Sequence, residues 1–170
     1  SEEFLGRILK GKRDSVLVAT KWGMKMGDGP HKSGGSRKYI MAAVEDSLRR
    51  LQTDYIDLYQ LHRPDPQTPM EETLRALDDL ISSGKVRYIG HSNFAGWQAA
   101  EAHFVAQKGN YTPFISAQNE YSLLERRIEA ELVPACNQYG VSVLPFFPLA
   151  SGFLTGKYRQ GQDLPAGTRL

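Results

Sequence analysis

Two spacings of hydrophobic residues alternate along the chain. Short runs of β-branched and other aliphatic residues, typical of buried strands, are separated by longer segments whose apolar positions recur every three or four residues, as in amphipathic helices. The pattern predicts a helix over residues 1–10 and strands that begin near residues 16, 56, 86, 114 and 141, with one helix in each interval. This serial order requires parallel strands joined by right-handed crossovers.

Capping residues indicate where two of the helices begin and end. Ser36 is expected to cap the helix that follows it, and Thr68 and Glu71 have the spacing of a capping box, with Pro69 at the first helical position. Gly84 predicts a left-handed residue at the end of that second helix. One helix is thus expected in each of the first two intervals between strands.

The second predicted strand ends abruptly at His62. The sequence continues as Arg-Pro-Asp-Pro, and the prolines stop the strand because each lacks an N–H and has a fixed φ. His62 is therefore expected at the carboxyl end of a buried strand, where parallel α/β proteins bind ligands. Lys21 is expected in the same place after the first strand, residues 16–20. The alternatives are a core histidine with satisfied ring nitrogens and a lysine that is simply solvated.

Polar residues follow every predicted strand, and this distribution favours a barrel. A doubly wound sheet concentrates its ligand at one switch point, whereas a barrel brings all strand ends to one mouth; moreover, no Gly-x-Gly-x-x-Gly motif follows any strand. These polar residues are Lys21, His62, Ser92, Asn93, Gln118, Asn119 and Ser151. The predicted fold class is α/β, a (β/α)₈ TIM barrel that is incomplete, because 170 residues are too few for eight units and supply about five parallel strands.

Composition points away from several function classes. The formal net charge is only +2 and no long basic run occurs, so nucleic acid is not an expected partner. Neither a membrane span nor a signal peptide is expected, because no apolar run is long enough. Cys136 is the one cysteine, which fits a reducing, cytoplasmic compartment. The histidines lack Cys, Asp or Glu at metal-ligand spacing, so no metal site is predicted.

An ordered set of motifs resembles the aldo-keto reductase family. The set comprises Lys21, Leu-His-Arg-Pro-Asp at 61–65, Gly-Lys-Val-Arg-Tyr-Ile-Gly at 84–90, Ser-Asn-Phe at 92–94, Gln-Asn-Glu-Tyr at 118–121, Pro-Leu-Ala-Ser-Gly at 148–152 and Leu-Thr-Gly-Lys at 154–157. The resemblance implies one partial barrel domain over residues 1–170, from the family's second helix through its seventh strand, with both ends truncated. Bacterial members are the most similar, and potassium-channel β subunits are similar more distantly.

The resemblance implies an NAD(P)H-dependent oxidoreductase that reduces aldehydes and ketones to alcohols, with a small carbonyl compound as its substrate. Lys21 corresponds to the family's lysine, whose ammonium favours the phenolate form of a catalytic tyrosine. His62 corresponds to the histidine that orients and polarises the carbonyl. The family's aspartate and tyrosine have no counterpart in the chain, so the 170 residues alone are expected to be inactive.

Cofactor contacts implied by the resemblance lie at the ends of the last three predicted strands. Ser92, Asn93 and Gln118 match residues that hydrogen-bond the nicotinamide carboxamide, which offers both donors and acceptors. Phe146 stands where many members have a tyrosine that stacks on the nicotinamide ring. The loop that passes over the pyrophosphate corresponds to Leu149, Ser151, Gly152 and Leu154. NADPH is the expected cofactor, with NADH as the alternative.

Two other functions stay open at this point. One is a nicotinamide-dinucleotide-binding regulatory subunit with little turnover, as in the channel-subunit branch. The other is a Schiff-base aldolase using Lys21, because a lysine at the end of a barrel strand is also where such enzymes form their imine. The amide and hydroxyl side chains of Ser92, Asn93 and Gln118 speak against the aldolase, which has no need of a carboxamide site.

Overall fold

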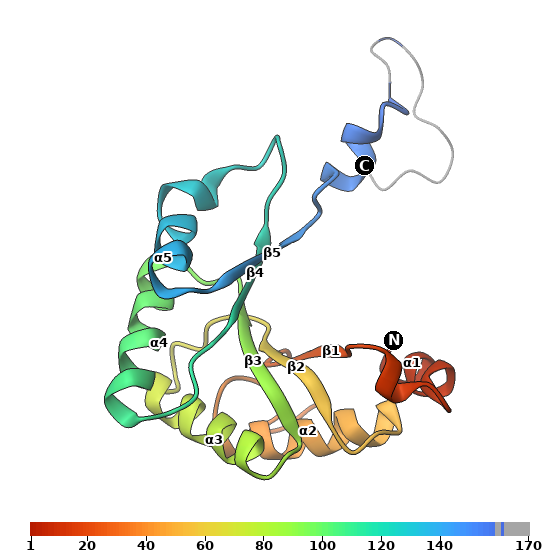
Figure 1. Ribbon diagram of the computed structural model, residues 1–170, viewed down its shortest axis with the longest axis vertical. Coiled ribbons are helices and arrows are strands. Elements are labelled where there is room, and N and C mark those ends of the chain that lie inside the picture. The colour runs from red at the N-terminus through yellow and green to blue at the C-terminus, as the bar shows by residue number, and fades with distance from the viewer. Residues whose placement is uncertain (159–160, 162–170) are drawn as a thin grey trace.

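Helices and parallel strands alternate along the chain in the computed structural model, which describes residues 1–158 and 161 (Figure 1). The strands are β1 (Ala19–Trp22), β2 (Ile56–Leu61), β3 (Val86–Ser92), β4 (Ser116–Glu120) and β5 (Ser142–Phe146). The α-helices are α1 (Glu2–Leu9), α2 (Arg37–Leu51), α3 (Met70–Ser82), α4 (Gly96–Gly109) and α5 (Leu132–Tyr139). Short 3₁₀ helices are η1 (Arg13–Ser15), η2 (Arg127–Ala130) and η3 (Ala150–Thr155). None of the helices in this described part has the length and apolar character needed to cross a membrane.

The strands lie in the sheet in the order in which they occur in the sequence, β1-β2-β3-β4-β5, and every pair is parallel. The sheet therefore winds in one direction, as in a barrel, whereas a doubly wound sheet would reverse its order. Figure 1 shows that the sheet curves, with α2 to α5 on the outer side of the curve. The predicted fold class, an incomplete (β/α)₈ barrel of about five parallel strands, is confirmed.

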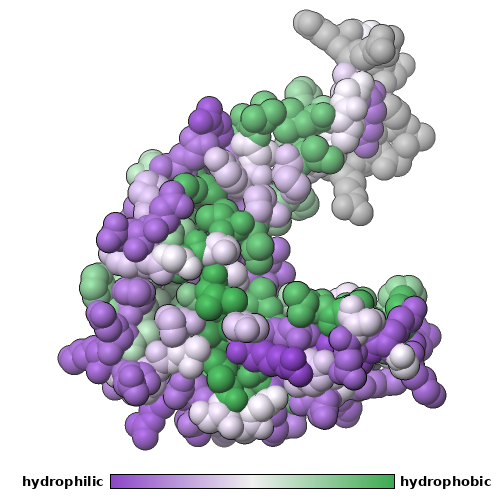
Figure 2. Space-filling view, in the orientation of Figure 1, coloured by the Kyte–Doolittle hydropathy of each residue, from purple (hydrophilic) through white to green (hydrophobic). Residues whose placement is uncertain are grey.

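The two faces of the curved sheet differ in burial. Tyr59, Leu61 and Ile89 belong to the main hydrophobic core, in which β2 and β3 pack against α2 and α3. Residues that alternate with them point to the inner face, since successive side chains of a strand project to opposite sides. There, Tyr88 and Leu144 are 54% and 37% exposed, whereas Gln60 and Ser92, which project to the same side, are buried. Figure 2 shows this inner side as an open hollow with apolar surface along it.

The first strand begins later than predicted and is less buried. β1 covers Ala19–Trp22 instead of residues 16–20, so Lys21 lies inside the strand rather than after it. Leu17, expected within a buried strand, is 88% exposed. Among the described strands β1 pairs only with β2, and this edge position leaves most of its residues open on one side. The prediction of a buried first strand is therefore wrong.

The third and fourth strands extend further toward their carboxyl ends than predicted. Ser92 is the last residue of β3, and Gln118 lies in the middle of β4. The two residues are direct partners in the register of the parallel ladder. Polar side chains that were expected to follow the strands are thus carried by the strands themselves, which holds them more firmly than a loop would.

Side-chain capping is weaker than the sequence indicates. Gly84 has φ +76°, which is the left-handed conformation expected after α3. The predicted capping box is wrong: the N-cap of α3 is Pro69, and the Thr68 hydroxyl donates to Asp65 Oδ2 at 2.7 Å instead. Ser36 is the N-cap of α2, but its side chain makes no capping hydrogen bond.

Candidate active site

Lys21 and His62 come together at the carboxyl edge of the sheet. Lys21 pairs in register with Gln60 of β2, so both side chains project from the same face. His62 follows the end of β2 and is two residues beyond Gln60, which directs it to that face as well. Both residues line one cleft of about 530 Å³ that runs along β1, the strand at the edge of the sheet, and its other walls come from α1, α2 and the loop after β1. The sequence placed these two residues at strand ends, and the structure brings them into one cleft.

The surroundings of His62 favour its neutral form. Burial lowers the pKa of the imidazole below its ordinary value of 6.5, and the positive charges of Lys21 and Arg63 lower that pKa further. Burial also lowers the pKa of the Lys21 ammonium group. At neutral pH the histidine is therefore an uncharged imidazole that can donate one N–H, next to a lysine cation.

Aromatic packing supports the strand end that carries His62. The His62 N–H donates to the Trp22 carbonyl at 2.9 Å, which continues the contact between β1 and β2 past the end of β2. The Trp22 indole stacks on the Tyr59 ring with centroids 4.5 Å apart, and both side chains are buried. This pair was not predicted, because the contact depends on the register between two strands and leaves no signal in the sequence of either one.

Ser92, Asn93 and Gln118 form one hydrogen-bonded group next to the His62 main chain. Ser92 Oγ donates to the Gln118 main-chain carbonyl at 2.6 Å, and the Asn93 N–H donates to the same carbonyl at 3.1 Å. Asn93 Nδ2 donates to Ser92 Oγ and to the His62 carbonyl, each at 3.0 Å. Three of the predicted cofactor residues thus contact one another, and one of them contacts the backbone of the predicted catalytic histidine.

Gln118 carries an acceptor that nothing in the described part of the chain satisfies. Its side-chain Oε1 is buried and has no hydrogen-bond partner there. An unpaired buried oxygen of this kind costs about 1–3 kcal/mol, and a bound N–H group would remove that cost. A carboxamide NH₂ is such a donor. The group therefore fits the nicotinamide carboxamide that the sequence resemblance implies.

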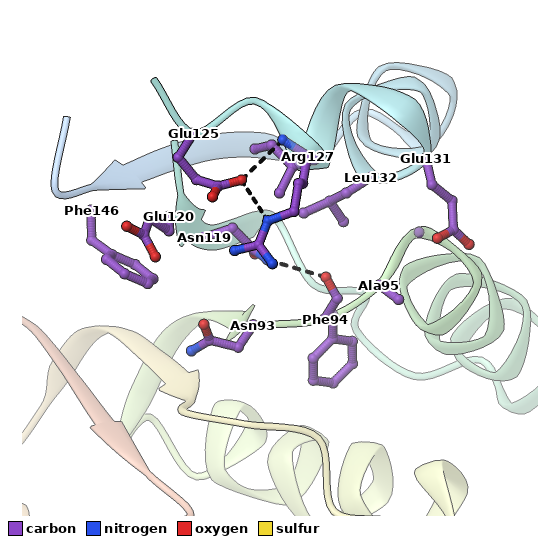
Figure 3. A pocket seen from close by; sticks show the side chains of 12 residues that line it. Asn93, Phe94, Ala95, Asn119, Glu120, Glu125, Arg127, Glu131, Leu132 and Phe146 are labelled. Atoms are coloured by element: carbon purple, nitrogen blue, oxygen red, sulfur yellow. Dashed lines mark hydrogen bonds and ion pairs between the residues drawn. The ribbon is translucent and has the colours of Figure 1, made fainter. Parts of the chain in front are cut away.

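A second pocket, of about 290 Å³, lies where β3, β4 and β5 end (Figure 3). Phe146, the last residue of β5, lines it together with Asn93. On another wall Arg127 Nε donates to Glu125 Oε1 at 2.7 Å. The structure thus brings Phe146 and Asn93 to one pocket. The Glu125–Arg127 pair was not predicted, because it lies on a connection for which the sequence pattern indicates no regular element.

The other four cofactor candidates lie on a separate segment. Leu149 directly precedes η3, and Ser151, Gly152 and Leu154 lie within it. Ser151 and Gly152 have φ values of +55° and +95°, and the N–H groups of Gly152 and Leu154 both donate to the Leu149 carbonyl. Figure 1 shows η3 beyond the end of β5, away from the ends of β3 and β4. The structure does not bring these four residues together with the group on β3 and β4.

Away from this edge, the cysteine and the most buried histidine lie in apolar surroundings. Within residues 1–158 and 161, no three His, Cys, Asp or Glu side chains are grouped so that they could hold a metal ion. Cys136 is buried in a small cluster with Leu132, and burial raises the pKa of its thiol. His91 is buried against Phe94 and Phe114. The carboxyl edge of the sheet is therefore the place where chemically useful groups meet.

Comparison with known proteins connects the chain to one family. The model of the "Aldo/keto reductase family" matches residues 1–169. The "Probable voltage-gated potassium channel subunit beta" of Oryza sativa subsp. japonica is 41% identical over 176 residues, covering 100% of this chain and 52% of that protein. The "Uncharacterized oxidoreductase YrpG" of Bacillus subtilis (strain 168) is 43% identical over 162 residues, covering 93% and 49%. The "L-glyceraldehyde 3-phosphate reductase" of Escherichia coli (strain K12) is 37% identical over 175 residues, covering 100% and 50%.

Similarity extends along nearly the whole chain, although the chain spans about half the length of these relatives. The matched region contains all five strands and the polar groups at their carboxyl ends. Because the family model matches almost every residue, this chain belongs to the aldo/keto reductase family.

Proposed function

We propose that these residues form the middle part of a longer NAD(P)H-dependent oxidoreductase, which reduces the carbonyl of an aldehyde or ketone to an alcohol. Family membership and the half-length coverage of relatives support this reading, and so does a sheet whose inner face lies open. NADPH is the proposed cofactor, with NADH as the alternative, and a small carbonyl compound is the proposed substrate.

The observation that carries the proposal is that Lys21 and His62, near the carboxyl ends of β1 and β2, line the same cleft. His62, held neutral by burial and by neighbouring cations, would donate its N–H to the substrate's carbonyl oxygen and orient it. The Lys21 ammonium would stabilise negative charge that develops beside it, either on that oxygen or on a tyrosine hydroxyl that acts as the proton donor. The two residues thus supply orientation and charge stabilisation, respectively.

The cofactor would be held by residues from three strands. Ser92, Asn93 and Gln118 would bind the carboxamide, and Phe146 would pack against the nicotinamide ring. The unpartnered Gln118 Oε1 supports this role, because it requires a donor such as the carboxamide N–H. When bound, the reduced dinucleotide supplies the hydride for the carbonyl carbon. The proposed contacts with its pyrophosphate are Leu149, Ser151, Gly152 and Leu154.

Steady-state reduction of simple aldehydes and ketones by the longer protein, followed as NADPH consumption, tests the proposal. His62→Ala should lower turnover by about two or more orders of magnitude, which is the scale of a positioned acid–base or electrostatic group. His103→Ala is the matched control, because His103 stacks on Tyr139 on the outer helices. A His62→Ala protein as fast as the wild type would rule out this role for the histidine.

The 170 residues alone should not reduce carbonyls. By the family resemblance the proton donor is a tyrosine upstream of Lys21, and residues 1–20 contain none. Losing a positioned proton donor removes about 10²–10⁴-fold in rate. The check is a turnover assay on purified chain whose mass has been confirmed. An enzymatic rate from that sample would mean that another group donates the proton.

A dinucleotide-binding regulatory subunit with little turnover is the second candidate. It is favoured by the 41% identity to the rice protein named as a probable potassium channel β subunit. Tight binding of NADPH by the longer protein, without steady-state reduction of any carbonyl compound, would support this candidate over the reductase.

A Schiff-base aldolase is the third candidate, favoured by the lowered pKa of Lys21, since an amine must be neutral to attack a carbonyl. It gives the unpartnered Gln118 Oε1 no role. Borohydride treatment in the presence of a carbonyl substrate distinguishes the aldolase from the reductase. Covalent labelling of Lys21 would support the aldolase, and an unlabelled Lys21 would rule it out.

A further inference from the structure

The Asn93 side chain connects two strand ends. Asn93 directly follows β3 and has φ +60°, a left-handed conformation that asparagine adopts more readily than most other residues. Its Nδ2 lies 3.0 Å from the carbonyl oxygen of His62, which follows β2. The last residue pair of the ladder between these strands is Leu61 with His91. The asparagine amide therefore extends the connection between β2 and β3 by one residue, up to the histidine.

Both main-chain polar groups of His62 are held by neighbouring elements. The N–H donates to the Trp22 carbonyl of β1 at 2.9 Å, and the carbonyl accepts from Asn93 Nδ2 at 3.0 Å. Beyond His62 the chain enters Arg-Pro-Asp-Pro, in which the prolines can donate no main-chain hydrogen bond. These two contacts thus fix the backbone from which the imidazole projects.

The amide nitrogen of Asn93 has no hydrogen left for a ligand. An amide NH₂ has two hydrogens, and Nδ2 donates to two acceptors, the His62 carbonyl and Ser92 Oγ, each at 3.0 Å. Ser92 in turn donates its hydroxyl hydrogen to the Gln118 main-chain carbonyl at 2.6 Å. Asn93 can therefore meet a cofactor only through its Oδ1, while its N–H groups act within the protein.

We propose that Asn93 is a positioning residue for His62, whatever contact it also makes with the cofactor. Its amide restrains the His62 carbonyl and thereby the direction of the imidazole in the cleft. Ser92 links the same amide to β4, so that the histidine is held relative to the group that would bind the carboxamide. The inference rests on the proposed function, because His62 has a substrate to orient only if the protein is a reductase.

The imidazole itself reports on this contact without any turnover. Asn93→Gly removes the amide and leaves the left-handed backbone favourable. In an NMR titration of the longer protein, the pKa of His62 should rise toward 6.5 in this variant, because a loosened strand end admits water while Lys21 and Arg63 stay in place. A pKa that stays at the wild-type value in Asn93→Gly would overturn the proposal.

Asn110→Gly is the matched control for this titration. Asn110 also has a left-handed conformation, with φ +53°, and it caps the carboxyl end of α4. The pocket that Asn93 lines lies at the other end of α4, at Gly96. The control should leave the pKa of His62 unchanged. If Asn93→Gly lowers the yield of folded protein, Asn93→Asp tolerates the left-handed backbone and removes the same NH₂ donor, and an unchanged kcat in that variant would overturn the proposal.

Turnover separates positioning of His62 from binding of the cofactor. At saturating dinucleotide, Asn93→Gly should lower kcat by up to about 10²-fold, which is the scale for a displaced catalytic group. In a His62→Ala background the same substitution should leave kcat nearly unchanged, because there is no imidazole to orient. A weaker dinucleotide Kd with unchanged kcat would overturn the proposal. If no variant reduces any carbonyl, the proposed function fails, and the His62 titration still decides whether Asn93 holds the histidine.

Discussion

Arg13 Nη2 lies 2.7 Å from Asp57 Oδ2, and the two side chains are only 14% and 7% exposed. Asp57 also accepts the Val18 N–H at 2.9 Å, and Arg13 donates to the Tyr55 carbonyl at 2.9 Å. The pair therefore joins the segment before β1 to the start of β2, at the edge of the sheet opposite the candidate site. Breaking it leaves one buried charge without a partner.

Asp57→Ala should accordingly lower the free energy of unfolding by about 3–5 kcal/mol, the scale for removing one partner of a buried ion pair. Urea unfolding measures the change. Asp46→Ala is the control, because it removes a more exposed ion pair with Arg49 and should change the free energy of unfolding by about 0–1 kcal/mol. Similar losses in the two variants would contradict the interpretation.

Acid should destabilise the fold through His91. This residue is 1% exposed and stacks on Phe94, and both of its ring nitrogens lack a partner within the described residues. Burial lowers its pKa to about 4, so in the range between that value and 6.5 the unfolded chain binds the proton more readily than the folded chain. The stability due to neutral His91 is complete above pH 6.5 and decreases as the pH falls toward 4, by about 3 kcal/mol in all.

Urea unfolding at several pH values, for wild type and His91→Phe, isolates this contribution. The phenylalanine keeps an aromatic ring against Phe94 and cannot be protonated, so the variant should lose less stability than the wild type on acidification. His103→Phe, on the outer surface of α4, is the control, and its free energy of unfolding should decrease on acidification by as much as that of the wild type. The idea would be refuted by parallel pH profiles for wild type and His91→Phe.

Gly90 has no room for a side chain. A Cβ on Gly90 would lie 2.1 Å from Ser116 Oγ, its partner in the register of β3 and β4. Gly90→Ala should lower the free energy of unfolding by about 1–3 kcal/mol, as overpacking of an interior position does. The double variant Gly90→Ala/Ser116→Gly should recover part of that loss. Chemical denaturation of the two single variants and the double variant tests this, and strictly additive losses would show that the two residues do not collide.

The charge of Lys21 should be visible in the titration of His62. Lys21→Met removes an ammonium that lowers the pKa of the imidazole, so that pKa should rise while burial and Arg63 still keep it below 6.5. Lys108→Met, in the last turn of α4, is the control and should have no effect. Histidine-resolved NMR titration provides the measurement. An unshifted His62 in Lys21→Met would mean that the two groups do not interact.

The winding of the sheet was predictable because each strand and each helix leaves its own periodicity in the sequence. Parallel pairing in sequence order then follows from the regular alternation of the two element types. The boundaries were less predictable. Val16 and Leu17 read as a buried strand, but both are exposed, and β1 begins only at Ala19. An apolar side chain is stabilised by burial, but it is buried only where another element of the fold packs against it.

The candidate site was predictable in its residue types more than in its contacts. Lys21 and His62 were predicted as site residues because each lies near the carboxyl end of a predicted strand, and parallel strands bring these ends to one edge of the sheet. The bond from Asn93 to the His62 carbonyl was not found, because it needs the register of β2 and β3 together with a left-handed residue after β3. The position of η3 relative to the strands could not be predicted either, because no periodic pattern in the sequence relates the two.

Serial strand order has a consequence for how the chain can fold. Each of β2 to β5 pairs with the strand that was synthesised just before it, with a single α-helix between them. Loop closure is inexpensive for such neighbours, and contacts that are close in sequence favour fast folding. The sheet can therefore grow on the ribosome in the direction of translation, one βα unit at a time.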